Sequence, residues 1–162
     1  MEFPIIEGWP NQGVGRVNLD GSRGACSACH TRHRFSIEMA RKPYTCKECH
    51  VGPDVPAFKV YSASKHGNIF SSMNAEWDFN KVPWTIGEDI QAPTCATCHM
   101  SGIGDLLTTH NISERLYWNG WAKRSEMRNS TDPMSPLLGN GPKGREKMKQ
   151  VCSSCHGVLH TD

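Results

Sequence analysis

The sequence predicts a mainly α-helical fold with extensive loop and very little strand. Three observations predict it. The five-residue pattern Cys-x-x-Cys-His occurs four times, beginning at Cys26, Cys46, Cys95 and Cys152. Between these patterns the stretches with helical periodicity are short, and turns rich in Gly and Pro separate them. Hydrophobic residues make up only 37% of the chain, which is a thin supply for a conventional core.

Cys-x-x-Cys-His is the signature for attachment of c-type haem. The two thiols add across the haem vinyl groups, and the adjacent imidazole becomes an axial ligand of the iron. Two intervening residues let one helical turn place both sulfurs on one edge of the porphyrin. We therefore expect four covalently attached haem c groups, tethered by Cys26, Cys29, Cys46, Cys49, Cys95, Cys98, Cys152 and Cys155 and ligated on one side by His30, His50, His99 and His156.

Two other uses of paired cysteines were weighed. The first two pairs form Cys-x2-Cys-x16-Cys-x2-Cys, a spacing that also suits a four-cysteine zinc site. A Cys-x-x-Cys pair can also be a redox dithiol. Neither use explains why His follows the second Cys four times out of four, which chance gives on the order of once in 10^5 sequences of this histidine content.

Haem also changes what the composition implies. At roughly 40 residues per haem, the porphyrins would form much of the core, so we expect the apoprotein to be largely unfolded. The formal net charge is +2, and two propionates on each haem would take it to roughly −6. The slight basicity therefore does not indicate a nucleic-acid partner, and no Lys/Arg run interleaved with aromatic residues occurs.

No apolar stretch approaches the roughly 20 residues that a membrane span needs. The first six residues, Met-Glu-Phe-Pro-Ile-Ile, lack the basic and apolar regions of a signal peptide. Haem c is attached outside the cytoplasmic membrane, so we expect an exported protein, periplasmic or extracellular at the cell surface. The sequence is then expected to be a mature chain, a fragment or a recombinant product.

The chain is expected to form one tetrahaem domain over residues 1–162. Its expected parts are an irregular N-terminal arm (1–23), a part with haems one and two (24–73) and a part with haems three and four (74–162). In the first half we expect a short helix over 36–42 that Pro43 ends, a turn over 51–56, and one helix over 58–73 that carries His66.

In the second half, residues 74–94 show no periodicity and are expected to be an irregular connection. A helix is predicted over 112–128, starting at Asn111 with Glu114 three residues later. Residues 129–144 are expected to be turn-rich and exposed. A last helix over 145–156 would place Met148, Val151, Cys152 and Cys155 on one face, against the fourth haem.

Four histidines remain outside the motifs, one for each iron: His33, His66, His110 and His160. We expect them to be the second axial ligands, because two imidazoles make a six-coordinate, low-spin iron that suits electron transfer. Methionine is the main rival ligand, with Met39, Met73, Met100 and Met127 as candidates. That choice would leave four histidines without a role.

Geometry restricts the pairing of these ligands. His33 follows His30 by three residues and His160 follows His156 by four, so both start on the proximal side of their own haem. The second ligand must approach from the opposite face, with its nitrogen roughly 4 Å from the first. We predict that His33 and His160 ligate a different haem or the haem of another subunit. Such cross-ligation would hold porphyrins close together, as in an electron wire.

Several blocks of sequence resemble the octahaem hydroxylamine oxidoreductase family. They are Gly13–Ser36, Ala40–Pro43, Cys49–Asp54, Tyr61–Gly67, Ala92–Met100 and Thr109–Arg115. The resemblance implies an α-rich multihaem fold and a role in redox chemistry of nitrogen compounds or in its electron transport. It also implies that the matching histidines are distal ligands.

The departures from this family matter as well. Family enzymes carry eight haems, whereas this chain has four motifs. The family's Gly-Pro-Asp-His-Pro segment, with its active-site Asp-His pair, reads Gly52-Pro-Asp54-Val55-Pro here. The long C-terminal helical extension, with the tyrosine that crosslinks to the catalytic haem, has no counterpart.

The sequence thus favours a tetrahaem electron-transfer cytochrome with redox partner proteins. Its subunits could stack haem to haem as a homo-oligomer or filament. The alternative is a small hydroxylamine- or nitrite-handling oxidoreductase with one open iron and Asp54, Lys65 or Tyr61 as proton donor. A third hypothesis is a subunit or fragment that another haem-bearing chain completes.

Overall fold

The computed structural model describes residues 26–53, 56–104, 106–110, 115 and 141–157. Within these residues the fold is helical with extensive loop and without strands, as predicted, and the isolated bridge between Ile86 and Ile90 is its one β-type pairing. No helix in these ranges has the length and apolarity to cross a membrane. The arm over 1–23, the predicted helix over 112–128 and residues 129–140 lie outside the described residues, apart from Arg115.

The first two motifs are separated by a short helix, as the sequence predicts. After the 3-10 turn η1 (Cys26–Ala28), helix α1 (Ile37–Arg41) begins where the Ser36 hydroxyl accepts the N–H of Met39 at 3.3 Å. Pro43 ends α1 and also opens helix α2 (Pro43–Lys47), because its fixed φ and missing N–H suit the first position of a helix. Helix α2 was not predicted, and it carries Cys46 into the second motif.

The single helix predicted over 58–73 is wrong, because the structure has two. Helix α3 (Ala57–Ala63) ends at Ser64, whose backbone is extended, and helix α4 (Lys65–Met73) starts at once. The Ser64 hydroxyl accepts the N–H of Gly67 at 3.1 Å and donates to the carbonyl of Tyr61 at 2.6 Å. A serine inside a helical pattern can therefore end one helix and cap the next.

The connection over 74–94 is irregular, as predicted, but it supplies much of the core. After the 3-10 turn η2 (Asn74–Glu76), it contributes most of a buried cluster with Phe70 of α4: Trp77, Phe79, Trp84, Ile90 and Ala92. Phe70 meets Trp77 edge-on at 5.7 Å and Phe79 at 6.3 Å between ring centroids. The aromatic side chains thus bury a segment that has no regular backbone structure.

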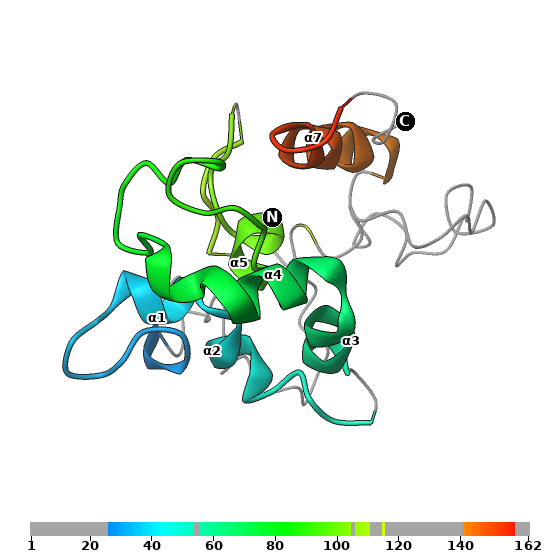
Figure 1. Ribbon diagram of the computed structural model, residues 1–162. Coiled ribbons are helices and arrows are strands. Elements are labelled where there is room, and N and C mark those ends of the chain that lie inside the picture. Colours follow the sequence, from blue (N-terminus) through cyan, green and yellow to red (C-terminus); the bar gives the residue numbers. More distant parts are fainter. Residues whose placement is uncertain (1–25, 54–55, 105, 111–114, 116–140, 158–162) are drawn as a thin grey trace, which may run out of the picture.

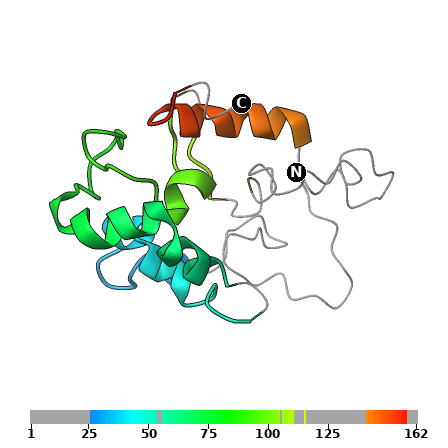
Figure 2. The ribbon, with the colours of Figure 1, turned by 45° about the vertical axis from the view of Figure 1, so that its right-hand side comes forward.

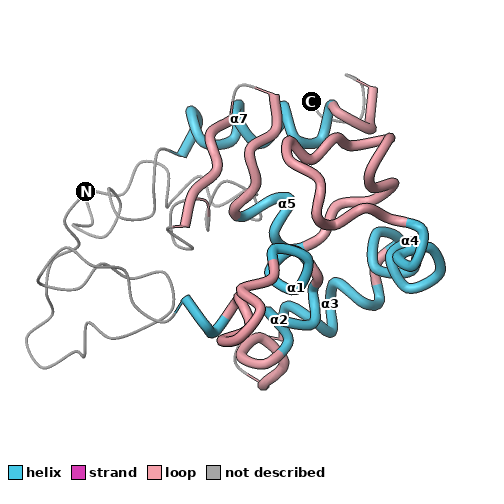
Figure 3. Tube along the Cα trace, turned by 90° about the vertical axis from the view of Figure 1, so that its left-hand side faces the viewer, coloured by secondary structure: helices cyan, strands magenta, loops and turns pink. Residues whose placement is uncertain are grey.

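Helix α5 (Cys95–His99) lies between two parts of the molecule. Figures 1, 2 and 3 place it below helix α7 (Gly141–Ser153) and above α1, α2 and α3. Helix α5 contacts α1, α2 and α7, and it is closed by a capping box in which Thr94 and Thr97 bind each other's backbone. The third motif is therefore the central one.

Helix α7 begins earlier and ends earlier than predicted, at Gly141 and Ser153 instead of residues 145 and 156. Met148 and Val151 are buried and pack with Leu106, Ile103 and Cys98. Cys152 and Cys155 are exposed. The four residues expected on one face thus divide into an apolar pair against the protein and a cysteine pair on the surface.

Candidate haem-attachment sites

The cysteine–histidine motifs share one backbone turn. In three of them the carbonyl of the first cysteine accepts the N–H groups of the second cysteine and of the histidine; the two distances are 3.2 and 2.9 Å at Cys26, 3.2 and 2.9 Å at Cys46, and 3.1 and 2.9 Å at Cys152. The third motif is itself helix α5. The turn that attachment of both sulfurs to one porphyrin edge requires is therefore present at every motif.

The four motifs follow one another in space as they do in the chain. Burial, and then the thiols of Cys46 and Cys49, raise the pKa of Cys29, so motifs one and two are neighbours. A hydrogen bond to Cys95 raises the pKa of Cys46 and links motif two to motif three. Burial, and then Cys152, raise the pKa of Cys98 to about 11, which places motif four beside motif three.

His30 is held in the tautomer that an iron ligand needs. Its Nδ1 donates to the carbonyl of Ser36 at 3.0 Å, which leaves the lone pair on Nε2. Metal-bound histidines commonly use their second nitrogen in this way. The ring also stacks on Phe35, with 4.4 Å between centroids and 6° between planes.

A cavity of about 880 Å³ opens beside the first motif. Cys26, Cys29 and His30 line it. His110, at the end of the loop that follows the third motif, lines it as well. The rest of its lining is mostly apolar, with Phe35, Ile37, Val82, Trp84, Ile103 and Leu106 among the residues. Its volume is within the range of ligand pockets, and its donor set fits haem c: two thiols, one oriented imidazole and a second imidazole.

The loop that carries His110 is tied down at several points. The N–H of Thr109 donates to the carbonyl of Met100 at 2.9 Å, which closes the loop at its base. The buried Arg115 donates to the carbonyls of Ser101 at 2.8 Å and Leu107 at 2.6 Å. These bonds fix the backbone that brings His110, itself exposed, to the cavity.

His66 and His156 come together from distant parts of the chain. Their ring centroids are 5.9 Å apart and their planes are tilted by 52°. An iron with two axial imidazoles separates the two bound nitrogens by roughly 4 Å, and each ring centroid lies about 1 Å behind its nitrogen. The observed centroid distance is thus close to the roughly 6 Å of such an axial pair, and the contact joins helix α4 to the turn that follows helix α7.

Of the remaining histidines that the structure describes, none forms a ring pair of this kind. His99 is partly buried, and burial, followed by His50 and Arg115, lowers its pKa. His50 and His33 are exposed. His160 lies outside the described residues, so its predicted cross-ligation stays a prediction, as does that of His33.

The rival ligands and the expected proton donors are placed as follows. Met39 is exposed, Met73 packs against the aromatic core, Met100 lines the cavity, and Met127 lies outside the described residues. The Tyr61 hydroxyl donates to the carbonyl of Pro93 at 3.1 Å, and burial raises its pKa. Lys65 is exposed, while Asp54 and Val55 are outside the described residues.

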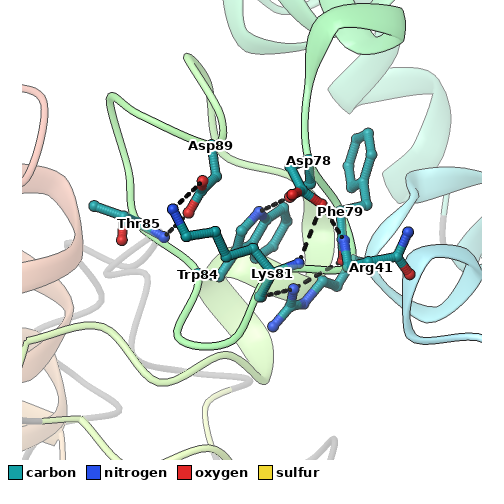
Figure 4. Close-up of polar contacts among 8 residues, drawn as sticks. Arg41, Asp78, Phe79, Lys81, Trp84, Thr85 and Asp89 are labelled. Carbon is teal, nitrogen blue, oxygen red and sulfur yellow. Dashed lines mark hydrogen bonds and ion pairs between the residues drawn. The ribbon is translucent and has the colours of Figure 1, made fainter.

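One feature of the first site was missed by the sequence reasoning. Arg41 lines the cavity and donates from Nη1 to the carbonyls of Phe79 at 2.8 Å and Lys81 at 2.6 Å (Figure 4). Its guanidinium carbon lies 4.5 Å from the centroid of the Trp84 ring. The only available signal was the density of aromatic residues over 77–84, which indicates burial of that segment but names no partner for it.

Comparisons with known proteins agree with this geometry. In an alignment of 162 residues, the chain is 33% identical to a probable nitrite reductase–hydroxylamine oxidoreductase fusion protein of Kuenenia stuttgartiensis. The match covers 81% of this chain and 18% of that protein. A hypothetical multiheme protein of known structure superposes with a TM-score of 0.70 at 33% identity, over 96% of this chain and 42% of that one.

A chain of the Kuenenia stuttgartiensis reducing HAO-like protein complex gives a TM-score of 0.67 at 28% identity, over 86% of this chain and 30% of that one. The chain therefore spans less than half the length of these relatives. The model of the family described as "Seven times multi-haem cytochrome CxxCH" matches residues 14–161. This chain has four CxxCH motifs. Because that match covers nearly the whole sequence, the chain belongs to the multi-haem cytochromes, a family that implies covalently bound haem c.

Proposed function

We propose that this chain is a tetrahaem c-type cytochrome, folded as a single domain over 1–162, that transfers electrons between redox partner proteins. When bound, haem c supplies a one-electron Fe(III)/Fe(II) couple. The paired cysteines of each motif tether one haem, and His30, His50, His99 and His156 each bind one iron. The neighbouring positions of successive motifs support short distances between the four groups.

The observation that carries the proposal is the spacing of His66 and His156. It supports a bis-His iron at the fourth motif, and the shared cavity supports His110 as the second ligand opposite His30. His33 and His160 are then left for the second and third irons, from this chain or from a neighbouring subunit. An iron with two imidazoles has no open position, which suits electron transfer.

The test uses the haem-loaded protein. Mass spectrometry is expected to show four added haems, and electron paramagnetic resonance is expected to show low-spin ferric iron alone. The oxidised protein should not bind cyanide, because no iron has an open position. Fewer haems would contradict the tetrahaem proposal, and a bare polypeptide mass would contradict haem attachment altogether.

A finer proposal concerns assembly and location. Haem c attachment supports export, to the periplasm or the cell surface, and the relative in a protein complex supports a partner chain. Haem-to-haem stacking of subunits into a filament would give the exposed His33 a ligand role across an interface. Negative-stain microscopy of the haem-loaded protein tests this: filaments support it, and monomers at all concentrations oppose it.

A second candidate function is an oxidoreductase acting on small nitrogen compounds such as hydroxylamine or nitrite. The roomy cavity at the first motif favours it, because an exposed His110 could leave that iron open. The printed name of the Kuenenia relative points to the same chemistry. A high-spin ferric signal in the native protein, together with ready binding of hydroxylamine, would favour this function over electron transfer.

A further inference from the structure

We propose that Arg41 raises the reduction potential of the haem held by the first motif, by fixing a positive charge in the wall of its cavity. The same guanidinium would bind a carboxylate of that haem. This inference rests on the proposed function, because it requires a haem at Cys26 and Cys29. It assigns the tuning of one iron to one side chain.

The position of the Arg41 charge is fixed by the protein. Both of its hydrogen bonds within the described residues leave from Nη1, to the carbonyls of Phe79 and Lys81. The guanidinium carbon lies over the ring of Trp84, 4.5 Å from its centroid, and Trp84 lines the same cavity. Arginine has five N–H donors, so those on Nε and Nη2 remain for a carboxylate. The fork geometry of guanidinium suits carboxylate binding.

Arg41 is also the sole permanently charged residue among the described residues that line the cavity. The two nearby carboxylates do not line the cavity, and both interact with other partners. Asp89 pairs with Lys81 at 3.3 Å, and Asp78 Oδ1 accepts the N–H of Asn80 at 2.9 Å and that of Lys81 at 3.2 Å. Of the four charged side chains in this group, Arg41 is thus the one that borders the cavity.

A fixed positive charge changes the balance between the two oxidation states. Reduction adds one electron to the iron, so a nearby cation stabilises the reduced form. In a mostly apolar cavity this interaction is screened less than on the surface. Removal of the charge should lower the potential of the first haem and leave the other three near their original values.

The experiment is a redox titration of the haem-loaded protein. Electron paramagnetic resonance monitors it, because its signals distinguish the four irons. In Arg41→Met, the midpoint potential of one haem is expected to fall by about 59 mV. This corresponds to an about tenfold smaller equilibrium constant for its one-electron reduction. Arg41→Lys keeps the charge, so its transition should stay close to that of the original protein. The matched control is Lys59→Met, which removes an exposed charge on α3 that does not line the cavity.

Three outcomes would overturn the inference: unchanged potentials in Arg41→Met, an equal shift of all four transitions, or a shift in Arg41→Lys as large as in Arg41→Met. The last would show a structural role for the hydrogen bonds and none for the charge. Mass spectrometry of each variant is done first. A missing haem in the original protein contradicts the proposed function, whereas four haems with an unmoved potential contradict only the role of Arg41.

Discussion

The contact between His66 and His156 bears directly on the choice between catalysis and electron transfer. An iron bound by one imidazole has an open position, and the second imidazole closes it. His66 lies in the first turn of α4 and reaches the motif at the other end of the chain. In the proposed bis-His iron at the fourth motif, the second ligand would therefore be supplied by tertiary structure.

His66→Ala should convert about a quarter of the haem from low spin to high spin, because one iron of four loses a ligand. Electron paramagnetic resonance of the oxidised protein measures this. A matched control is Asn68→Ala, an exposed residue of the same helix, which should leave the spectrum unchanged. A fully low-spin spectrum in His66→Ala would remove His66 from the ligand set.

The ligand set and its pairing differ in how far the sequence predicts them. The eight histidines could be named from the count of four motifs and four remaining imidazoles. Their pairing could not, because His30 and His110 come to line one cavity only through a loop whose backbone Thr109 and Arg115 hold in place. Spacing along the chain excludes some pairs but selects none.

At the scale of elements, the corner between α3 and α4 is built around a glycine. A Cβ at Gly67 would lie 2.1 Å from the carbonyl oxygen of Tyr61, so the first turn of α4 touches the last turn of α3. The residue before this glycine is His66. The corner thus fixes the start of the helix that carries His66, the proposed second ligand of the fourth iron.

Gly67→Ala should destabilise the protein by about 1–3 kcal/mol, because backbone atoms must separate to admit the methyl group. It should also raise the high-spin fraction by moving His66. Denaturant unfolding and the resonance spectrum measure the two effects. The control is Gly52→Ala, since nothing lies within 4 Å of that position. Equal stability of the two variants would show that the corner relaxes freely.

The loop over 74–94 shows what pattern reasoning misses at this scale. Its residues lack periodicity, so the sequence predicts its irregular backbone but not its burial. Its order comes from side chains that reach the backbone: Trp84 Nε1 donates to the carbonyl of Asp78 at 3.1 Å, and Asp89 accepts the N–H of Thr85 at 2.8 Å (Figure 4). The break at Ser64 was missed for the same reason, since a cap competes with the helix only through specific local bonds.

Acid should loosen this loop through Asp89. The N–H of Thr85, and then Lys81, hold the pKa of Asp89 below its ordinary value of 3.8. A lowered folded pKa gives stability that is complete above the unfolded pKa and is lost as the pH falls through the folded value. The protection factors of residues 77–92, which correct for the intrinsic pH dependence of amide exchange, should therefore fall between about pH 5 and about pH 2 in the original protein.

Asp89→Asn is the comparison for this titration. It should exchange faster than the original protein at pH 5 and above, and the difference should shrink as the pH falls. A difference that stays constant across this range would show that the Asp89 charge contributes nothing to the loop.

For the whole molecule, the protein part of the core divides into two small clusters that the attachment motifs join. Both are found among the residues that the structure describes: one is the aromatic group around Phe70, and the other lies under Met148 and Val151 of α7. Helix α5 sits between them and carries the third motif. The small size of these clusters agrees with the low hydrophobic content of the sequence. The haems bound at the motifs are expected to supply the remaining contacts of the core.

The apoprotein should therefore lack a cooperative fold. Tethers at Cys152 and Cys155 together with ligation by His66 would fasten α7 to α4. Without haem, the buried apolar contacts of α7 in the described part of the chain are those with Cys98, Ile103 and Leu106. Binding energy at such sites doubles as folding energy. A chain made without haem attachment should show reduced helical circular dichroism and a broad, non-sigmoidal melt, while the haem-loaded protein melts sharply. A sharp melt of the haem-free chain would mean that the two clusters suffice for cooperative folding, and that the haems bind to a fold that forms without them.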